Sequence, residues 1–200
     1  MRHFITVSSL LVPLLALSST AGAATPINQV HPLEARGRID IENLKGRIQV
    51  RAWDRAEVKI SGTLGDGVEK LVVEGDAGHL VIKVQYPKGG GWGGQKSGPT
   101  DLQLTVPVRA DLDIDSVSAN VDVSGVAPAV LSIESVSGDV YLAAAPGEVD
   151  VESVSGDLRL TVNSGDVEAQ SVSGNVLLRG RMNGEIKVET VSGGIDVVVN

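Results

Sequence analysis

The sequence is poor in the residues that form disulfides, bind metals or stack on ligands. Its 200 residues contain no cysteine, three histidines, one phenylalanine, two tyrosines and two tryptophans. Without cysteine the chain has no disulfide, no thiol nucleophile and no cysteine for a lipoprotein anchor. The fold must therefore be stabilised by the burial of aliphatic side chains.

Familiar catalytic and cofactor motifs are also missing. His31 and His79 stand in no metal-ligand spacing. The sequence contains neither a G-x-S-x-G nucleophile motif nor a phosphate-binding loop motif. We therefore predict a protein without catalytic residues, metal site or cofactor.

Positive charge is scarce relative to negative charge. The chain has 17 Lys and Arg against 25 Asp and Glu, a net charge of −8. Removal of residues 1–23, whose only charged residue is Arg2, makes the net charge −9. This balance disfavours nucleic acids and anionic membrane surfaces as partners.

The segment 1–23 has the pattern of a cleaved export signal. Arg2 supplies a positive charge, residues 4–17 are mostly apolar, and residues 21–23 (Ala-Gly-Ala) resemble a cleavage site. The apolar run is shorter than the ~20 residues of a membrane-spanning helix, and no later segment is a candidate span. We expect a mature chain that begins near Ala24 and is periplasmic, in the cell envelope or extracellular.

A five-residue unit repeats ten times in residues 110–200. It reads small, any, apolar, any, apolar, and successive units start nine or ten residues apart. Nineteen of the twenty apolar positions are Val, Leu or Ile, and the exception is Ala169. Apolar residues two apart lie on one face of a β-strand, so each unit predicts a short strand. The units begin at Ala110, Ala119, Ala129, Gly138, Gly147, Gly156, Gly165, Gly174, Gly184 and Gly193.

Alternate units are preceded by a Ser-Val-Ser or Thr-Val-Ser signature. The signature recurs with a period of about 18–19 residues, and such a period indicates a solenoid, in which each repeat packs on its neighbours. We predict an all-β, right-handed parallel β-solenoid whose coils contain two short strands, with Gly-Asp or Gly-Asn turns. The valines of the signature are expected to point inward at one corner: Val117, Val136, Val154, Val172 and Val191. The opposite corner is less apolar and holds Val126, Ala145, Asn163 and Arg181.

Two other arrangements can be compared with the solenoid. A helix does not fit apolar pairs two apart that are separated by glycine every nine residues. Sequential β-hairpins stay open as an alternative, because Asn183-Gly184 is a good hairpin turn. The recurrence of like residues favours a parallel stack, in which they form ladders. The serines Ser116, Ser135, Ser153 and Ser171 are then expected to form a corner ladder that satisfies backbone groups.

The first half of the chain is less regular. Residues 24–36 are a polar leader, and residues 37–109 form irregular strands that include a glycine-rich loop at 88–99. Within this half, residues 37–41 and 46–50 match the repeat unit and again start nine residues apart. The solenoid pattern therefore begins before the regular repeats.

Several of these segments resemble a known family. They are the two early units, Trp53-Asp54, the strand 101–107 that ends in Val-Pro, and the Ser-Val-Ser-Gly-Asp-Val coils. From about Gly37 to Asn200 the chain resembles the bacterial domain family of unknown function labelled putative adhesin. The resemblance implies a β-helix in the cell envelope. The adhesin label is itself an analogy between folds and implies no particular binding residues.

The outward columns of the repeats differ between the two faces. One face carries seven acidic residues and one lysine, which reads as a solubilising surface or as a site for cations or a basic partner. Calcium is not expected, because single Asp residues follow the glycines instead of the G-G-x-G-x-D repeat of calcium-binding β-rolls. The other face offers Tyr141 beside Arg159 and Arg179, which are residue types favoured in interfaces. With Trp92 of the glycine-rich loop, these are the candidate binding residues.

Two functions are compatible with these patterns. The first is a non-catalytic envelope or surface protein that presents a solenoid flank to a glycan or protein partner. The alternative is a polysaccharide-degrading β-helix enzyme, which needs two carboxylates flanking a cleft. The carboxylates follow the repeat and form no isolated pair, which favours the non-catalytic function.

The last strand, residues 195–199, is followed only by Asn200. A solenoid needs a polar cap on its terminal coil. The sequence therefore predicts either that the natural protein continues further or that the final coil pairs with another chain, with self-association through this edge.

Overall fold

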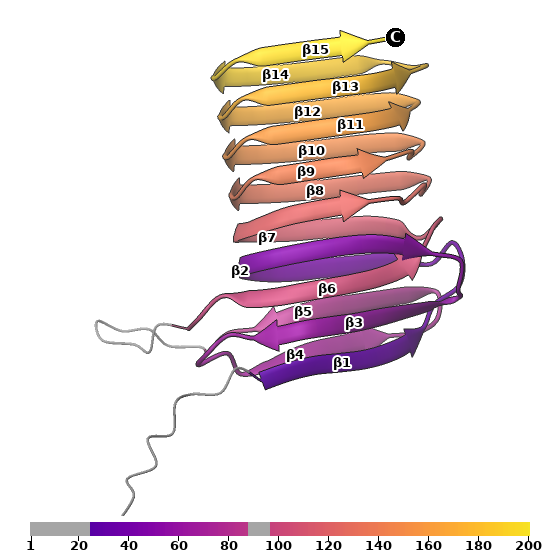
Figure 1. The fold of residues 1–200 in the computed structure, drawn as a ribbon, viewed down its shortest axis with the longest axis vertical. Coiled ribbons are helices and arrows are strands. Elements are labelled where there is room, and N and C mark those ends of the chain that lie inside the picture. The colour runs from indigo at the N-terminus through magenta and orange to yellow at the C-terminus, as the bar shows by residue number, and fades with distance from the viewer. Residues whose placement is uncertain (1–24, 88–96) are drawn as a thin grey trace, which may run out of the picture.

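A computed structural model describes residues 25–87 and 97–200 of the chain. The described residues form fifteen β-strands and no helix, which confirms the all-β prediction (Figure 1). It follows that the described part contains no helix that could cross a membrane. The expected signal at 1–23 and the candidate Trp92 lie outside the described residues.

The strands follow one another with short connections through most of the chain. Their bounds are β1 Thr25–Pro32, β2 Arg38–Trp53, β3 Glu57–Leu64, β4 Lys70–Gly75, β5 His79–Gln85, β6 Thr100–Pro107, β7 Asp111–Ser124, β8 Val130–Ser137, β9 Val140–Ala144, β10 Glu148–Ser155, β11 Leu158–Ser164, β12 Asp166–Ser173, β13 Val176–Met182, β14 Ile186–Ser192 and β15 Ile195–Val199.

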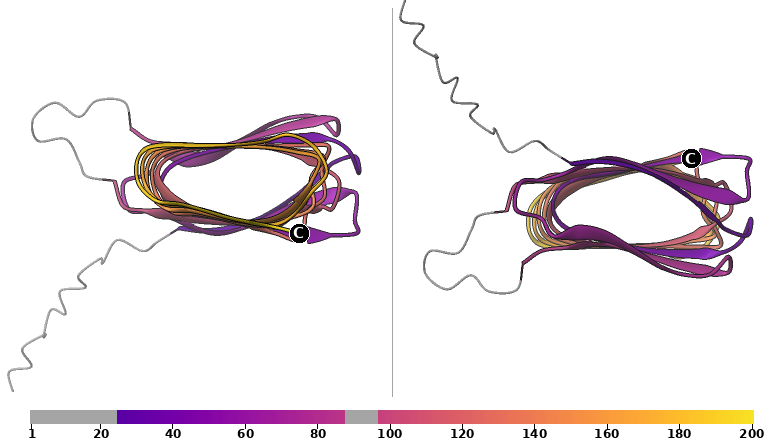
Figure 2. Two further views of the ribbon diagram at one scale, coloured as in Figure 1. Left: turned by 90° about the horizontal axis from the view of Figure 1, so that it is seen from above. Right: turned by 90° about the horizontal axis from the view of Figure 1, so that it is seen from below.

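The C-terminal half is a stack of parallel strands with two faces. Strands β8, β10, β12 and β14 pair in parallel on one face, and β9, β11, β13 and β15 pair in parallel on the other. The register aligns equivalent repeat positions, so Leu131, Val149 and Val167 lie above one another. Seen along the stack, the coils superpose as a flattened ring (Figure 2). The right-handed sense of the coil stays a prediction.

Two long strands contribute to both faces. The first part of β7 pairs with β8 and its last part pairs with β9. β2 runs parallel to β7 along almost its whole length, although the two strands are far apart in the sequence. The register places Ile39 beside Leu112 and Ile48 beside Val121, so the two early repeat units lie directly on the first regular ones.

At its N-terminal end the stack contains antiparallel strand pairs. On one face β2 pairs in parallel with β5, and β5 pairs antiparallel with β4. On the other face β2 pairs in parallel with β6. β6 then pairs antiparallel with β3, and β3 pairs antiparallel with β1. Residues 24–36, expected to be a polar leader, thus contain strand β1, which pairs with β3.

The core is a column of aliphatic side chains between the two faces. The inward positions of the repeats are buried from β7 to β13, including Ala169, whose small side chain is fully buried. Burying one such Val, Leu or Ile side chain contributes about 1.5–3 kcal/mol before the entropy of folding is counted. The buried core of the described stack therefore consists mainly of aliphatic side chains.

The orientation of the signature valines was predicted wrongly. The period-two alternation of each strand continues to the corner, so the serine before each valine points inward and the valine points outward. The serines at 116, 135, 153 and 171 are buried, whereas Val154 is 49% exposed and Val191 is 82% exposed. Val117, Val136 and Val172 are also exposed. At the opposite corner, Val126 is buried and Ala145, Asn163 and Arg181 are exposed.

The buried serines do not all satisfy the backbone as expected. Ser116 does, because its Oγ accepts from the Ala119 N–H (3.0 Å) and donates to the Ala119 carbonyl (2.9 Å). The hydroxyls of Ser135, Ser153 and Ser171 have no hydrogen-bond partner among the described residues. Small side chains suit this crowded corner, but the hydrogen-bonded ladder is limited to its first member.

The corner glycines allow the coils to stack closely. A Cβ added at Gly138, Gly156 or Gly174 would lie 2.3, 2.3 and 2.1 Å from the carbonyl oxygen of the preceding coil. Only Gly156 of these three has a positive φ, so close approach of the backbones is the main reason for glycine here.

The Asp or Asn that follows the small residue at this corner, Ala119 or a glycine, links one coil to the next. Its side-chain oxygen accepts a hydrogen bond from a backbone N–H of the following coil, which stabilises the turn. The pairs are Asn120 with Asp139 (3.1 Å), Asp139 with Asp157 (3.0 Å), Asp157 with Asn175 (3.1 Å) and Asn175 with Gly194 (2.9 Å).

The last coil has a neighbour on one side only. Within the described chain, β14 pairs with β12 alone and β15 pairs with β13 alone. The inward side chains of Ile195 and Val197 are consequently 47% and 40% exposed. Self-association through this edge stays a prediction.

Candidate functional site

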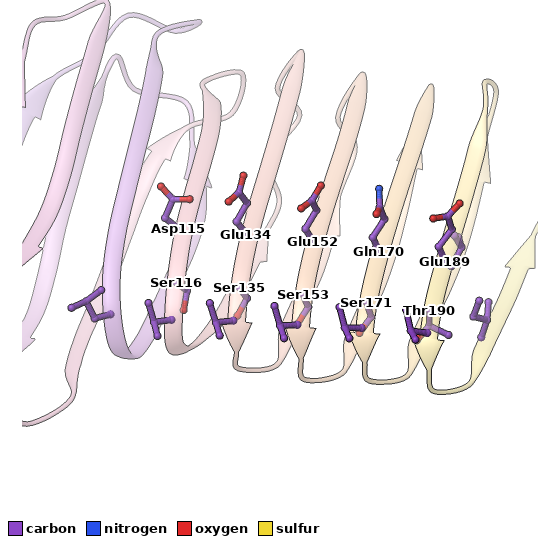
Figure 3. Close-up of a pocket in the computed structure, with 18 of the residues that line it drawn as sticks. Asp115, Ser116, Glu134, Ser135, Glu152, Ser153, Gln170, Ser171, Glu189 and Thr190 are labelled. Carbon is purple, nitrogen blue, oxygen red and sulfur yellow. The ribbon is translucent and has the colours of Figure 1, made fainter.

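A groove runs along one corner of the stack, across β7, β8, β10, β12 and β14, and its ends are lined by Glu42 and Leu44 of β2 and by Ile195 of β15. Its volume is about 970 Å³. One wall is formed by outward valines, which we call the valine ladder: Val117, Val136, Val154, Val172 and Val191. The other is formed by outward polar side chains, which we call the acidic ladder: Asp115, Glu134, Glu152, Gln170 and Glu189. Figure 3 shows the acidic ladder as one row across successive strands, beside the row of Ser and Thr residues.

The repeat itself builds both walls. Each acidic-ladder residue stands two positions before a valine-ladder residue, so both point to the outside of the same strand. The parallel register then places Glu152 between Glu134 and Gln170 on the neighbouring strands. Equivalent side chains are therefore repeated once per coil, at the strand spacing of about 4.8 Å.

The first three members of the acidic ladder are not neutralised by ion pairs. Asp115, Glu134 and Glu152 form no ion pair with the described residues. The pKa of Glu134 is raised by partial burial and by the charges of Asp115 and Glu152. The pKa of Asp115 is also raised, first by burial and then by the neighbouring Asp113 and Glu42.

The cations of this face lie at the margins of the ladder. Lys187 pairs with Glu168 (2.6 Å) and lies 4.0 Å from Glu189 at one end of the stack. At the other end Arg38 pairs with Asp113 (2.5 Å), and Lys83 pairs with Glu42. Glu168 and Asp113 belong to the next outward column, whereas Glu189 and Glu42 line the ends of the groove. Between these margins the groove keeps a negative wall opposite an apolar one.

Repulsion along the acidic ladder should appear as a pH-dependent cost to stability. A carboxyl with a raised pKa binds its proton more tightly in the folded protein, so its contribution to stability improves as the pH falls through that pKa. Glu134→Gln removes the charge, and we expect the thermal midpoint at pH 7 to rise by about 1–3 °C. Below about pH 4 the difference should shrink towards zero, because the carboxyl is then protonated in both states.

The measurement is thermal unfolding by circular dichroism between pH 3 and 8. Glu185→Gln is the matched control, since Glu185 is exposed and lies outside the groove. A midpoint for Glu134→Gln that stayed below the wild-type value at pH 7 would contradict the repulsion argument.

The binding residues predicted from the sequence lie on the opposite flank. Arg159 donates to the Tyr141 hydroxyl (3.0 Å) and packs over its ring at 5.3 Å, while its other nitrogen pairs with Asp157 (2.8 Å). Arg179 is exposed in the neighbouring outward column. The structure thus brings Tyr141 and Arg159 together, and their polar groups are largely occupied by each other and by Asp157.

The two histidines of the described chain make ordinary surface contacts. The His79 Nε2 lies 2.8 Å from an Asp40 oxygen, and the His31 Nε2 lies 3.0 Å from the Gln29 amide oxygen. Within residues 25–87 and 97–200, no three potential ligands come close enough to hold a metal ion.

The sequence interpretation missed the groove because it turned the valines inward. The signal that could have found it is the unbroken alternation from Leu131 through Ile133 to Ser135, which already assigns Val136 to the outside.

The repeated half of the chain identifies its family. The family model described as Toastrack DUF4097 matches residues 95–200, which is more than half of the 200-residue chain. The chain belongs to the Toastrack DUF4097 family. This confirms the family resemblance seen in the sequence. No curated protein matches the Toastrack chain at a significant level.

The solved structures that the chain matches are distant in sequence. A putative cell adhesion protein from Clostridium sporogenes is 10% identical, with a TM-score of 0.44, over 88% of this chain and 100% of its own. A putative adhesin from Bacteroides fragilis is 14% identical, with a TM-score of 0.41, over 89% and 98%. A putative lipid binding protein from Parabacteroides distasonis is 14% identical, with a TM-score of 0.29, over 88% and 97%.

Proposed function

We propose that this Toastrack protein is a non-catalytic, exported module of the cell envelope that binds a glycan or protein partner along one flank of its stack. The observation that carries this proposal is the groove between the valine and acidic ladders. It is long, open and built from residues that repeat once per coil. Such a surface suits a partner that makes many similar contacts along its length.

The composition of the two walls supports binding over catalysis. Glycoside cleavage uses two carboxyl groups on opposite sides of the scissile bond, about 5–9.5 Å apart. Here the carboxylates all stand on one wall, and the facing wall is valine. Among the described residues, the polar groups between the walls are the buried or half-buried Ser and Thr side chains, which point into the corner.

Export is supported by the sequence of residues 1–23, with its early positive charge, apolar stretch and small-residue end. An exported protein without cysteine also suits an oxidising compartment, because it has no thiol to oxidise. Periplasmic, envelope-bound and extracellular locations all agree with these features.

The proposal is tested by binding and product assays on the purified protein. We expect retention on a panel of envelope polysaccharides or by proteins of an envelope extract, with no release of reducing ends. Val136→Ser/Val154→Ser should weaken that retention about tenfold, whereas Tyr141→Ala/Arg159→Ala should leave it unchanged.

Two outcomes would contradict the proposal. Release of cleaved sugar that disappears in Glu134→Gln would show an enzyme. Loss of retention in Tyr141→Ala/Arg159→Ala alone would place the binding surface on the opposite flank.

A further inference from the structure

The groove has a direction and a repeat that restrict what can lie in it. It runs along the stack, perpendicular to the strands, and its walls repeat at about 4.8 Å. Its wall residues from Val117 to Val191 come from five successive coils, a length of about 19 Å. A partner must therefore present apolar groups in a line with a similar spacing.

The spacing favours an α-helix over an extended chain. Side chains on one face of an extended chain repeat at about 6.6–6.8 Å. This repeat differs by about 2 Å from the ~4.8 Å spacing of the valine ladder, so an extended chain cannot keep successive contacts with it. A helix brings an apolar side chain to the same stripe once per turn, a repeat of about 5.4 Å. About 13 helical residues span the length of the groove, at a rise of about 1.5 Å per residue.

The negative charge of the groove indicates which side chains should flank the apolar stripe of such a helix. The carboxylates of Asp115, Glu134 and Glu152 have no cationic partner within the described chain. Lys or Arg beside the apolar stripe would reach this wall while the stripe covers the valines. An acidic helix would instead add to the repulsion already present.

We propose that the groove binds a basic amphipathic α-helix of a partner protein, three to four turns long, with its axis along the stack and its apolar stripe on the valine ladder. This inference rests on the proposed binding function and adds the chemistry of the ligand. It follows the general helix-in-groove mode, with the groove made by coil corners instead of by helices.

The first test uses synthetic peptides on the intact purified protein. A peptide of about 15 residues, with Leu at helical spacing and Lys on both sides of the stripe, is compared with a scrambled peptide of the same composition and with a version carrying Glu in place of Lys. Affinity is measured by calorimetry, and helix content by circular dichroism. We expect the scrambled and acidic peptides to bind at least about tenfold more weakly.

The second test uses variants of the protein. Glu134→Gln/Glu152→Gln should weaken binding of the basic peptide about three- to tenfold and reduce its salt dependence. The matched control is Glu148→Gln/Glu185→Gln, which removes two exposed charges outside the groove. Val136→Ser/Val154→Ser should weaken binding about tenfold without changing the thermal midpoint, because both valines are exposed.

The outcomes separate this inference from the proposed function. Equal binding of the basic and scrambled peptides, or equal effects of the groove and control variants, would overturn the helix inference. So would binding of the basic peptide without a gain in helix content. A glycan that binds the wild-type groove and is lost in Val136→Ser/Val154→Ser, with no peptide binding, would overturn the helix and leave the proposed function standing.

Discussion

Val151→Asp is expected to unfold the coils around β10. Val151 is fully buried between Ile133 and Ala169 of the adjacent coils, where the neighbouring side chains are aliphatic. An unpaired carboxylate at such a position destabilises a protein by more than about 4 kcal/mol. For a chain of this size we expect the thermal midpoint to fall by at least about 10 °C, measured by circular dichroism.

The matched control is Val154→Asp, three residues further along the same strand. Val154 is 49% exposed on the groove wall, so its replacement leaves the new carboxylate in water. We expect a change of only a few degrees, mainly from repulsion with the acidic ladder. Equal loss of stability in the two variants would show that the inward and outward sides of β10 are assigned wrongly.

Gly174→Ala should have the second-largest effect. The added Cβ would lie 2.1 Å from the Gly156 carbonyl oxygen and 2.9 Å from its carbonyl carbon, so the two coils must move apart. That movement would stretch the Asp157–Asn175 hydrogen bonds of 3.1 Å beside it. Overpacking of this kind costs about 1–3 kcal/mol or more, which corresponds to a fall of several degrees in the midpoint.

Gly194→Ala is the control for Gly174→Ala. Its Cβ would meet only the Asn175 side-chain oxygen at 3.2 Å, and a shift of a few tenths of an ångström in that side chain relieves the contact while the hydrogen bond from the Gly194 N–H is kept. Hydrogen exchange of the amides of β11 and β13 would show whether the damage at Gly174 is confined to the adjacent coils. A Gly174→Ala protein as stable as Gly194→Ala would mean that the coils are spaced more loosely than the structure shows.

Much of the repeated half could be predicted because its information is local. Two apolar residues two apart, bounded by glycine, specify a short strand with one buried side. The burial of the inward repeat positions, including Ala169 where the other units have Val, Leu or Ile, follows directly from that period. The acidic wall of the groove was likewise visible in the sequence as an outward column.

The orientation of the valines was missed for a reason that is also local. The hydrophobicity of a valine between two serines suggests that it is buried. However, its position in the alternation decides on which side of the strand it lies. Ser153 shares the inward side with Val149 and Val151, so Val154 has to face outward. Hydrophobicity gave the wrong answer where periodicity gave the right one.

The sequence by itself determined the all-β class, the coil period and the family, because each depends on residues a few positions apart. Only the tertiary structure decided that β2 lies on β7, that antiparallel strands end the stack, and that the groove has an apolar wall. These features depend on pairing between segments distant in the chain and on the bend of each strand at its corner. Backbone hydrogen bonding between strands is nearly independent of side-chain identity, so the pattern along one segment does not specify which distant segment it joins.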